Sequence, residues 1–578
     1  MNEKIFIGVA WPYANGSLHL GQIAGANLPA DIFARYHRTK GNEVLMVSGS
    51  DRHGTPVTIK AEQEGITPEE IAERYQREYL DCWQKLGISF DLYTTTGAKN
   101  HTEVAQDIFL KLLEKGYLYT AAESQAYCGK CRRFLPDRYV EGICPACGAP
   151  GARGDQCDAC GKPMNTSELI DPYCRICNTP PVFRESEHFY LKLSAFQERL
   201  EKWVGGKSHW KPNVLGMTQR YFKEGLKDRA ITRDIDWGVP VPVKGYENKR
   251  LYVWFEAVIG YLSASKEWAK LRGEPDKWHD YWDENSSAKS YYFLGKDNIV
   301  FHTIIWPAML VGYESLALPY DVPANEFLTI EGRKVSTSKN WAVWLPDYLE
   351  RYDPDPLRYI LSINMPETSD TDFSWREFVR RNNDELVATW GNLVNRVLTF
   401  TYRNFDGCVP QHSRYNEIRE YLSSIDKHAA STYDLSSDTH SQRLIEGVKD
   451  LLFKEADRHL YKCEFKHAIG NVMQVARETN QYLDEKSPWK VIKEDRQNAA
   501  DSLYVAMYAI SCLKTAFYPF LPFSSQQVHE YLGFPGHVQE YGWRPQVLQP
   551  GQQLKEPKPL FTKLDDIVIE EETKRIGT

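Results

Sequence analysis

Apolar and polar residues follow a strand–helix–strand pattern at the start of the chain. Residues 4–9 (KIFIGV) form a short apolar run closed by Pro and Gly signals, which predicts a buried strand. A helical pattern follows over 22–38 and ends before Gly41, and residues 43–48 (EVLMVS) predict a second strand. This order is typical of a parallel sheet, in which ligands bind at the carboxyl ends of the strands, and Asp51 lies at such an end.

This pattern is then interrupted. Residues 121–184 are rich in Cys, Gly, Pro and charged residues and have little periodicity. This predicts an insertion that is held together by its own cross-links. Helical patterning returns over 188–230, the β/α pattern resumes near 251–254 and again at 290–295, and 321–345 predict a loop-rich connector. The chain therefore predicts one α/β unit divided by an inserted segment.

A long helical region follows the connector. Residues 374–531 are mostly helical in pattern, and the Pro- and Gln-rich residues 546–578 cannot be assigned to any element. Apolar residues at i, i+4, i+7, i+11 and i+14 form one stripe near the start of this region: Leu386, Trp390, Leu393, Val397 and Phe400. The stripe predicts a helix with one buried face.

Composition narrows the class of protein. Of the 578 residues, 42% are apolar and 26% charged, as in ordinary globular proteins with several domains. The chain lacks an apolar run of ~18 residues that could span a membrane, and its N-terminus does not resemble a signal peptide. The net charge of −8 argues against a surface coated by nucleic acid but allows one local RNA-binding surface.

Eight of the 12 cysteines form four CxxC pairs: Cys128/Cys131, Cys144/Cys147, Cys157/Cys160 and Cys174/Cys177. In a chain without a signal peptide, such pairs indicate metal binding in a reducing compartment, which favours a cytoplasmic protein. A structural zinc ion takes four thiolates and each pair supplies two, so eight cysteines suit two structural zinc sites. The two inner pairs can share one site across the shortest spacer, leaving the two outer pairs for the other; pairing in chain order is the alternative.

Two segments carry residues suited to phosphate. Residues 11–22 (WPYANGSLHLGQ) join the first strand to the first helix, where Gly21 allows close approach to the backbone and His19 can donate a hydrogen bond. Residues 332–340 (GRKVSTSKN) place cations and hydroxyls in a Gly-opened loop, and Lys334 can follow charge that develops on a phosphate. Taken alone, each is most often an ordinary turn or a solvated basic loop.

Together the two segments are the signature pair of class I aminoacyl-tRNA synthetases. With SDRHGTP (50–56), YVWFEAVIGY (252–261) and FLGKDNIVFH (293–302), the chain closely resembles the methionyl-tRNA synthetases over essentially its whole length. The resemblance implies an α/β fold: a Rossmann-type parallel-sheet catalytic domain with a zinc-bearing insertion, then an α-helical anticodon-binding domain. It also implies that methionine attacks the α-phosphate of ATP, which binds with Mg²⁺, and that the methionyl group then passes to the 3′-terminal adenosine of tRNA(Met).

The resemblance assigns residues to ATP. His19 and Lys334 are the expected catalytic residues, and the expected ATP-binding residues are His19, Gln22, Asp297, Lys334, Ser336 and Thr337. Gln22 stands where the family usually has a second His, and Thr337 where it usually has a second Lys, so neither position carries a charge. Lys339 could substitute for the missing cation.

The resemblance also assigns a methionine pocket: Trp11, Tyr13, Asp51, Arg233, Trp254, Ala257, Tyr261, Phe301 and His302. Asp51 would pair with the α-ammonium group, Arg233 would lie near the carboxylate, and the aromatic rings would contact the polarizable thioether. The family usually has Leu at the position of Trp11 and Pro at that of Val258. Without the resemblance, these aromatic residues would more often belong to a core.

Three residues of the helical region match anticodon-reading positions of the family. Asn392 and Arg396 are four residues apart, hence on one helix face, and Trp489 follows Ser487-Pro488 at a helix start. Such side chains can hydrogen-bond to and stack on unpaired bases. The nested pairing of the CxxC units matches the two-knuckle branch of the same family.

The expected division of the chain is as follows: 1–117 and 236–325 for the two halves of the catalytic domain, 118–235 for the insertion, 326–373 for the Lys334 loop and connector, 374–545 for the anticodon-binding domain and 546–578 for a tail. A monomer without membrane contact is expected, because no further dimerising module fits. The alternatives are a synthetase for leucine, isoleucine, valine or cysteine, or an RNA-binding protein that has lost catalysis. The leucine, isoleucine and valine enzymes need a larger editing insertion, and the cysteine enzyme places a zinc ion in its amino-acid pocket. The presence of His19, Asp51 and Lys334 argues against an RNA-binding protein without catalysis.

Overall fold

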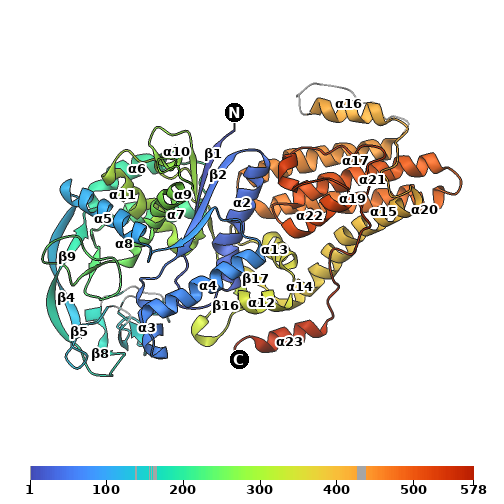
Figure 1. Cartoon of the computed structure of the whole chain (residues 1–578). Coiled ribbons are helices and arrows are strands. Elements are labelled where there is room, and N and C mark those ends of the chain that lie inside the picture. Colours follow the sequence, from blue (N-terminus) through green and yellow to red (C-terminus); the bar gives the residue numbers. More distant parts are fainter. Residues whose placement is uncertain are drawn as a thin grey trace.

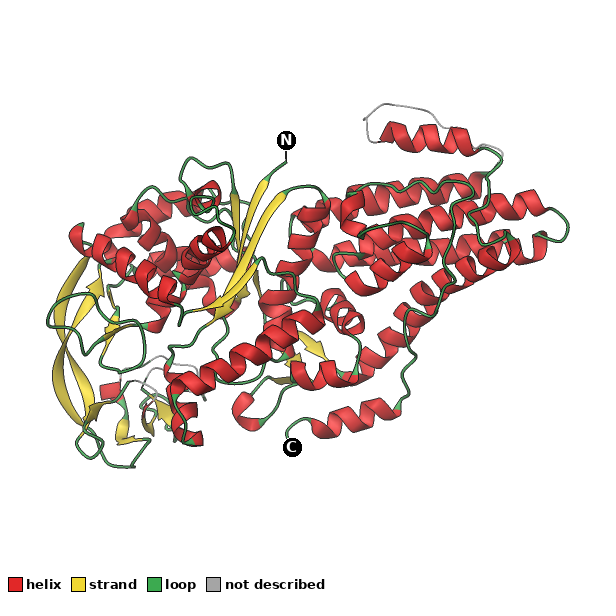
Figure 2. Ribbon diagram, in the orientation of Figure 1, coloured by secondary structure: helices red, strands yellow, loops and turns green. Residues whose placement is uncertain are grey.

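The molecule is elongated, with the sheets and the insertion at one end and a bundle of helices at the other (Figures 1 and 2). The computed structural model describes residues 2–136, 139–154, 157, 159–160, 164, 166–425 and 438–578. Within these residues, no helix is both long and apolar enough to cross a membrane.

A parallel sheet forms the centre of the first half. Its strands lie in the order β14 (Ala324–Asn325), β13 (Lys289–Gly295), β1 (Lys4–Val9), β2 (Glu43–Ser50) and β3 (Leu92–Thr95), and every neighbouring pair is parallel. The chain runs from β1 to β2 on one side and returns to β13 on the other. In open α/β sheets, ligands bind at such a reversal of strand order. Both strands predicted near the N-terminus are confirmed, and the second extends to Ser50.

Helices cover both faces of this sheet. Alternate side chains of a strand point to opposite faces, so Ile5 and Ile7 join one buried cluster and Phe6 the other. The first cluster contains α2 (Leu28–Thr39) with the preceding α1 (Leu20–Gln22) and η1 (Ile23–Asn27), which confirms the predicted first helix. The second contains α5 (Lys99–Glu114) and α9 (Gly260–Leu271). Burial of this apolar surface, worth roughly 25 cal/mol per Å², holds the layers together.

The insertion is built on a long antiparallel ribbon. Strands β4 (Leu118–Cys128) and β9 (Val182–Leu191) pair along almost their whole length, and the short strands β5 (Arg133–Phe134), β6 (Val140–Ile143), β7 (Ala152–Arg153) and β8 (Ile170–Cys174) lie near the end of the ribbon farthest from the sheet. The helical prediction for 188–230 is wrong at its start, because Phe189 and Leu191 alternate with polar neighbours and bury a strand face. Helices α6 (Gln197–Gly205) and α7 (Pro212–Glu224) carry the helical pattern instead.

The segment near 251–254 does not return to the parallel sheet. Its strand β12 (Arg250–Leu251) pairs antiparallel with β11 (Thr232–Arg233), and α8 (Val253–Ala257) follows directly. The other described elements of this half are α3 (Thr55–Glu64), α4 (Pro68–Leu86), η3 (Thr166–Glu168), η4 (Leu193–Phe196), β10 (Arg229–Ala230), α10 (His279–Trp282), η5 (Lys296–Asn298), η6 (Phe301–Ile305), α11 (Trp306–Tyr313), β15 (Leu328–Ile330), β16 (Arg333–Lys334), η7 (Thr337–Lys339), α12 (Leu345–Arg351), α13 (Pro354–Ile363) and β17 (Thr371–Phe373).

The second half is helical, as predicted. Its elements are α14 (Trp375–Arg381), η8 (Asn382–Gly391), α15 (Asn392–Asn404), α16 (Tyr415–Ile425), α17 (Thr439–Asp450), η9 (Leu451–Ala456), α18 (Asp457–Tyr461), α19 (Phe465–Lys486), α20 (Pro488–Val491), α21 (Arg496–Phe517) and α22 (Pro522–Tyr531). The predicted stripe faces the core: four of its side chains are fully buried, and Phe400 is partly buried.

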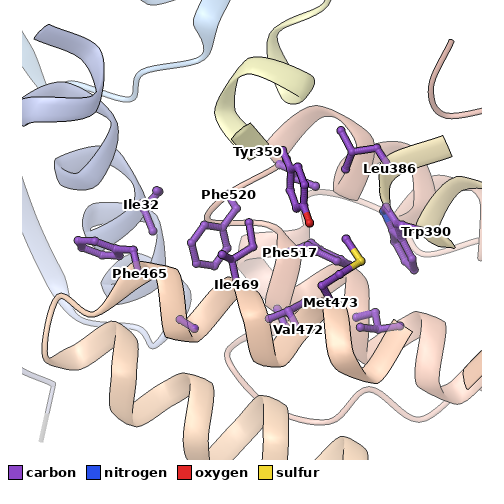
Figure 3. Packing of buried hydrophobic residues seen from close by; sticks show 14 of the residues in the cluster. Ile32, Tyr359, Leu386, Trp390, Phe465, Ile469, Val472, Met473, Phe517 and Phe520 are labelled. Carbon is purple, nitrogen blue, oxygen red and sulfur yellow. The ribbon is translucent and has the colours of Figure 1, made fainter. Parts of the chain in front are cut away.

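The two halves share one core and one buried ion pair. Ile32 of α2 lies beside Phe465 of α19 in this core (Figure 3). The fully buried Arg358 of α13 donates to Asp31 Oδ2 at 2.7 Å and to the carbonyl oxygen of Phe520 at 2.7 Å. These groups come from the sheet-covering helix, the connector and the helical bundle, so the ion pair and its hydrogen bonds join three parts of the chain.

The last residues fold back from the bundle towards the connector (Figure 1). Helix α23 (Ile567–Arg575) packs against α14, and Glu572 accepts two hydrogen bonds of 2.8 Å from Arg351. The N–H of Gly577 donates to the carbonyl oxygen of Asn340 at 3.0 Å. The sequence could not assign this segment because its partners are distant along the chain.

Candidate functional site

Strands β1 and β13 end side by side at a cleft of about 590 Å³. The turn after β1 and η5 form one wall, and residues of the β15–β16 hairpin and the loop after it form the other. All the residues predicted to bind ATP line this cleft: His19, Gln22, Asp297, Lys334, Ser336 and Thr337. The fold therefore joins two segments that are far apart in the sequence.

His19 lies at the start of α1 and is buried. Burial lowers the pKa of His19 to about 4, so its ring is neutral near pH 7 and offers one N–H donor. Its Nδ1 has no hydrogen-bond partner among the described residues. A Cβ atom on Gly21 would lie 3.0 Å from the ring, a tight contact that favours glycine here. Gln22, at the position where the family usually has a second His, holds this turn: its Oε1 accepts the backbone N–H of His19 at 3.0 Å.

The loop that carries Lys334 is tied to the His19 turn. Leu20 N–H donates to the Val343 carbonyl oxygen at 3.2 Å, and the rings of His19 and Trp344 lie 6.2 Å apart. Lys334 is exposed at the end of β16. Lys339 is also exposed but is not among the described residues that line the cleft. The structure thus brings Lys334 to the cleft and leaves Lys339 outside it.

A smaller cavity of about 70 Å³ lies beside the cleft and shares Trp11 and Tyr13 with it. Eight of the nine predicted methionine-pocket residues line it: Trp11, Tyr13, Asp51, Trp254, Ala257, Tyr261, Phe301 and His302. Arg233 instead lines an adjoining cleft of about 620 Å³, where its guanidinium stacks on Tyr252 at 4.1 Å. The sequence also missed Ala10 and Asn298, which line the cavity and whose residue types carry no signal of their own.

Aromatic residues form the walls of the small cavity. The rings of Trp254 and Phe301 meet edge to face at 4.7 Å, and the indole N–H of Trp254 donates to the hydroxyl of Tyr13. Trp11 fits between two glycines: a Cβ atom would lie 2.5 Å from its ring at Gly49 and 2.7 Å from it at Gly260. The two glycines thus make room for Trp11, which is larger than the Leu that the family usually has at this position.

Two polar groups face this apolar lining. Burial lowers the pKa of His302 to about 4, and its Nε2 accepts a hydrogen bond of 2.8 Å from the hydroxyl of Tyr261, while Nδ1–H donates to the carbonyl oxygen of Asn298 at 2.9 Å. Burial raises the pKa of Asp51 to about 8, and repulsion by Glu256 adds to this shift. The cavity therefore holds a carboxyl group that a bound cation would stabilise in its ionised form.

The eight CxxC cysteines form two clusters in the nested arrangement. In the outer cluster, the Sγ atoms of Cys128 and Cys177 lie 3.4 Å apart and those of Cys131 and Cys174 lie 3.9 Å apart. In the inner cluster, the Cys144–Cys160 and Cys147–Cys157 distances are 3.9 and 3.7 Å. A Zn–S bond of about 2.3 Å in a tetrahedron places sulfurs about 3.8 Å apart. Both clusters fit a closed, structural zinc site.

The three predicted anticodon residues lie on one surface of the helical half. Asn392 is exposed in the first turn of α15, and Arg396 follows one turn later. The guanidinium of Arg396 lies 4.0 Å over the ring of Trp489 and donates to Asp484 at 3.1 Å. Trp489 is half-buried rather than freely exposed, because one edge packs against Phe400.

The fold and the cleft define the class of protein. A parallel sheet with its ligand cleft at the β1/β13 reversal, lined by the His19 turn and the Lys334 loop, is the catalytic domain of a class I aminoacyl-tRNA synthetase. The family described as "tRNA synthetases class I (M)" matches residues 5–398, and the "Anticodon binding domain of methionyl tRNA ligase" matches residues 435–578.

Individual relatives agree with this class. A Methionine--tRNA ligase from Dehalococcoides mccartyi is 60% identical over 577 residues, covering all of both chains. One from Thermomicrobium roseum is 51% identical over 603 residues, covering 100% of this chain and 99% of the relative. The chain belongs to the methionyl-tRNA synthetase family. The structure of the Mycobacterium tuberculosis methionyl-tRNA synthetase in complex with methionyl-adenylate shares the fold, with a TM-score of 0.77 and 22% identity over 97% of this chain and 99% of that one.

Proposed function

We propose that this protein is a methionine–tRNA ligase that forms methionyl-adenylate from methionine and ATP and passes the methionyl group to the 3′-terminal adenosine of tRNA(Met). The observation that carries the proposal is the junction of two sites: the cleft that holds His19 and Lys334 opens beside an aromatic cavity with a buried carboxyl group, Asp51. A site for phosphates next to a site for an ammonium and an apolar side chain suits the joining of an amino acid to ATP.

The first step follows from these positions. Asp51 would hold the α-ammonium group, and the aromatic walls of the small cavity would take the thioether chain. This would aim the methionine carboxylate at the α-phosphate of ATP in the cleft that holds His19 and Lys334. The N–H of the neutral His19 and the ammonium of Lys334 would stabilise the charge that develops as pyrophosphate leaves. Positioning and charge stabilisation suffice, and no covalent intermediate with the protein is needed.

Other parts of the chain support the second step and the framework. A ribose hydroxyl of the tRNA would attack the methionyl carbonyl. Arg233, which lines the adjoining cleft, is the residue expected to approach the methionine carboxylate. Asn392, Arg396 and Trp489 would read the anticodon. Mg²⁺ would accompany ATP, and each thiolate cluster would hold one zinc ion, which keeps the ribbon tip folded.

The proposal includes a cytoplasmic monomer. A reducing compartment keeps the eight clustered thiols available for metal. A single chain supplies every residue of the proposed catalytic, metal and anticodon sites, so the activity needs no second subunit. We also propose the chain division given above, with the helical region from residue 374 as the anticodon-binding part. Light scattering of the purified protein tests the monomer.

Exchange of pyrophosphate into ATP, measured with each amino acid in turn, tests the proposed function. Methionine alone, or a close thioether analogue, should support exchange. Asp51→Ala should abolish exchange, because the α-ammonium group would be buried without a partner. Stronger exchange with leucine than with methionine, or no exchange with methionine, would contradict the proposal.

A further inference from the structure

A buried group of charged side chains lies directly behind the small cavity. Glu256 of α8 is fully buried, and its Oε1 lies 2.8 Å from Nδ1 of His53. Its Oε2 lies 3.4 Å from Nε2 of His101, on α5, which in turn bonds to Ser263 through Nδ1 at 2.9 Å. Glu256 does not line the cavity, so the reaction proposed above does not use it. Burying a carboxyl group is costly unless it is paired, so the position of Glu256 calls for an explanation.

His53 connects this acid to Asp51. The backbone N–H of His53 donates to Asp51 Oδ1 at 3.2 Å, and its imidazole is held by Glu256. The ring of Trp237 packs edge to face against His53 at 5.6 Å, and the indole N–H of Trp237 donates to the carbonyl oxygen of Arg52 at 2.6 Å. The turn that aims the Asp51 carboxyl group is therefore anchored by the side chain of its neighbour but one.

We propose that Glu256 is a positioning residue for the α-ammonium site, which holds the His53 turn so that Asp51 points into the methionine cavity. The proposal rests on the methionine site proposed above. Glu256 is well placed for this role because α8 also carries Trp254 and Ala257, two walls of the same cavity. One short helix thus sets both the shape of the cavity and the position of its carboxyl group.

The charges of the cluster support this role. Burial opposes ionisation of both partners, but the attraction between them raises the pKa of His53 and lowers that of Glu256, so the two form an ion pair with no net charge. Asp51 is then left as the single carboxyl group to be matched by a bound ammonium. The ionisable groups near the Asp51–Glu256 pair on the surrounding elements include Arg52, Tyr13, His53, His101, Tyr261 and His302.

This arrangement predicts a pH dependence. In the empty site the Asp51 carboxyl group, with its pKa of about 8, is protonated at neutral pH, and a methionine ammonium that binds it displaces one proton. The KM for methionine should therefore fall as the pH rises towards about 8. Repulsion by Glu256 affects Asp51 more than attraction by His53 does, so removing the charge of Glu256 should move this inflection to lower pH.

The test compares Glu256→Gln with the wild type in pyrophosphate exchange. At pH 8.5, above the wild-type pKa of Asp51 of about 8, the KM for methionine should rise roughly 10- to 100-fold in Glu256→Gln, as expected for a lost charge-assisted contact. The KM for ATP should stay within about twofold. Glu256→Asp, which keeps the charge, should recover part of the loss and keep the inflection near the wild-type pH.

Glu267→Gln is the matched control. Glu267 lies on the next helix, α9, accepts a hydrogen bond of 2.8 Å from the Thr94 hydroxyl, and does not belong to the cluster. This variant should leave the KM for methionine and the pH profile unchanged, and thermal unfolding should show that each variant folds. Wild-type KM and an unmoved inflection in Glu256→Gln would overturn the positioning role. Asp51→Asn separates the two proposals: if it also leaves the KM for methionine unchanged, the methionine site itself is misplaced.

Discussion

At the scale of single residues, the catalytic cleft depends on burial as much as on residue type. His19 would be an ordinary cationic imidazole in an exposed turn for part of the physiological pH range, but burial keeps it neutral here. Gln22 carries no charge, and its Oε1 holds the turn that contains His19. Of the described cations in the two motifs, Lys334 is the one that lines the cleft.

We therefore expect Lys334→Ala to slow methionine activation strongly. Loss of one donor to a transition-state charge typically costs about 2.7–4 kcal/mol, or roughly 10²- to 10³-fold in kcat. The KM for methionine should change little, because Lys334 does not line the small cavity. Lys339→Ala is the control within the same loop and should leave kcat within about twofold; a comparable loss there would mean that the loop moves Lys339 into the cleft. Steady-state exchange kinetics measure both variants.

At the scale of elements, the ribbon tip that carries the eight clustered cysteines is the part whose stability would depend most on bound metal. Few apolar side chains are buried near the Cys clusters, so this part of the ribbon has only a small core of its own. Two closed sites would supply the missing stabilisation. The distances place the inner and outer pairs in separate clusters, which excludes pairing in chain order among the described cysteines.

Metal analysis under reducing conditions should therefore find about two zinc ions per chain. Cys144→Ser should remove one ion and leave the outer site loaded, and Cys128→Ser should do the reverse. Cys82→Ser is the control, because Cys82 is buried and belongs to neither cluster. This variant should keep both ions. A protein without zinc would contradict the assignment, and loss of both ions from either single variant would show that the two sites fold as one unit.

At the scale of the whole molecule, the anticodon surface and the catalytic cleft lie in different halves. They are joined by a shared core (Figure 3) and by the buried Arg358–Asp31 pair. A packed joint of this kind suits the binding of one tRNA at both ends, because one buried core connects the two halves. It also means that a surface change at one end should not disturb the other.

Trp489→Ala should consequently matter only when tRNA is present. Removing a stacking platform costs ~1–3 kcal/mol per base, which corresponds to roughly 5- to 200-fold weaker aminoacylation. Asn392→Ala and Arg396→Ala should act in the same direction. Exchange of pyrophosphate without tRNA should stay near wild type for all three, since none of them lines a catalytic cavity. Wild-type charging of tRNA by all three would remove the anticodon assignment, and loss of tRNA-free exchange in a folded Trp489→Ala protein would contradict the separation of the two halves.

The sequence by itself determined the local features. The strands at 4–9 and 43–48, the first helix and the buried stripe from Leu386 to Val397 follow from apolar periodicity, which depends only on neighbouring residues. The residues expected around ATP and methionine came from the resemblance of short motifs, because a motif keeps residue types that chemistry requires. The last part of β9 (Val182–Leu191), from residue 188 on, was missed, since its buried alternation is too short to outweigh the helical pattern after it.

Only the tertiary structure decided how distant residues meet. Arg233 belongs to the neighbouring cleft, Lys339 lies outside the ATP cleft and Trp489 is half-buried, because each position depends on packing between elements and not on local pattern. The pairing of the cysteine clusters is likewise set by the ribbon that brings their sulfurs within reach. Glu256 is the strongest example: in the sequence it is one acid in a helical segment, and only the fold places its charge between two histidines behind Asp51.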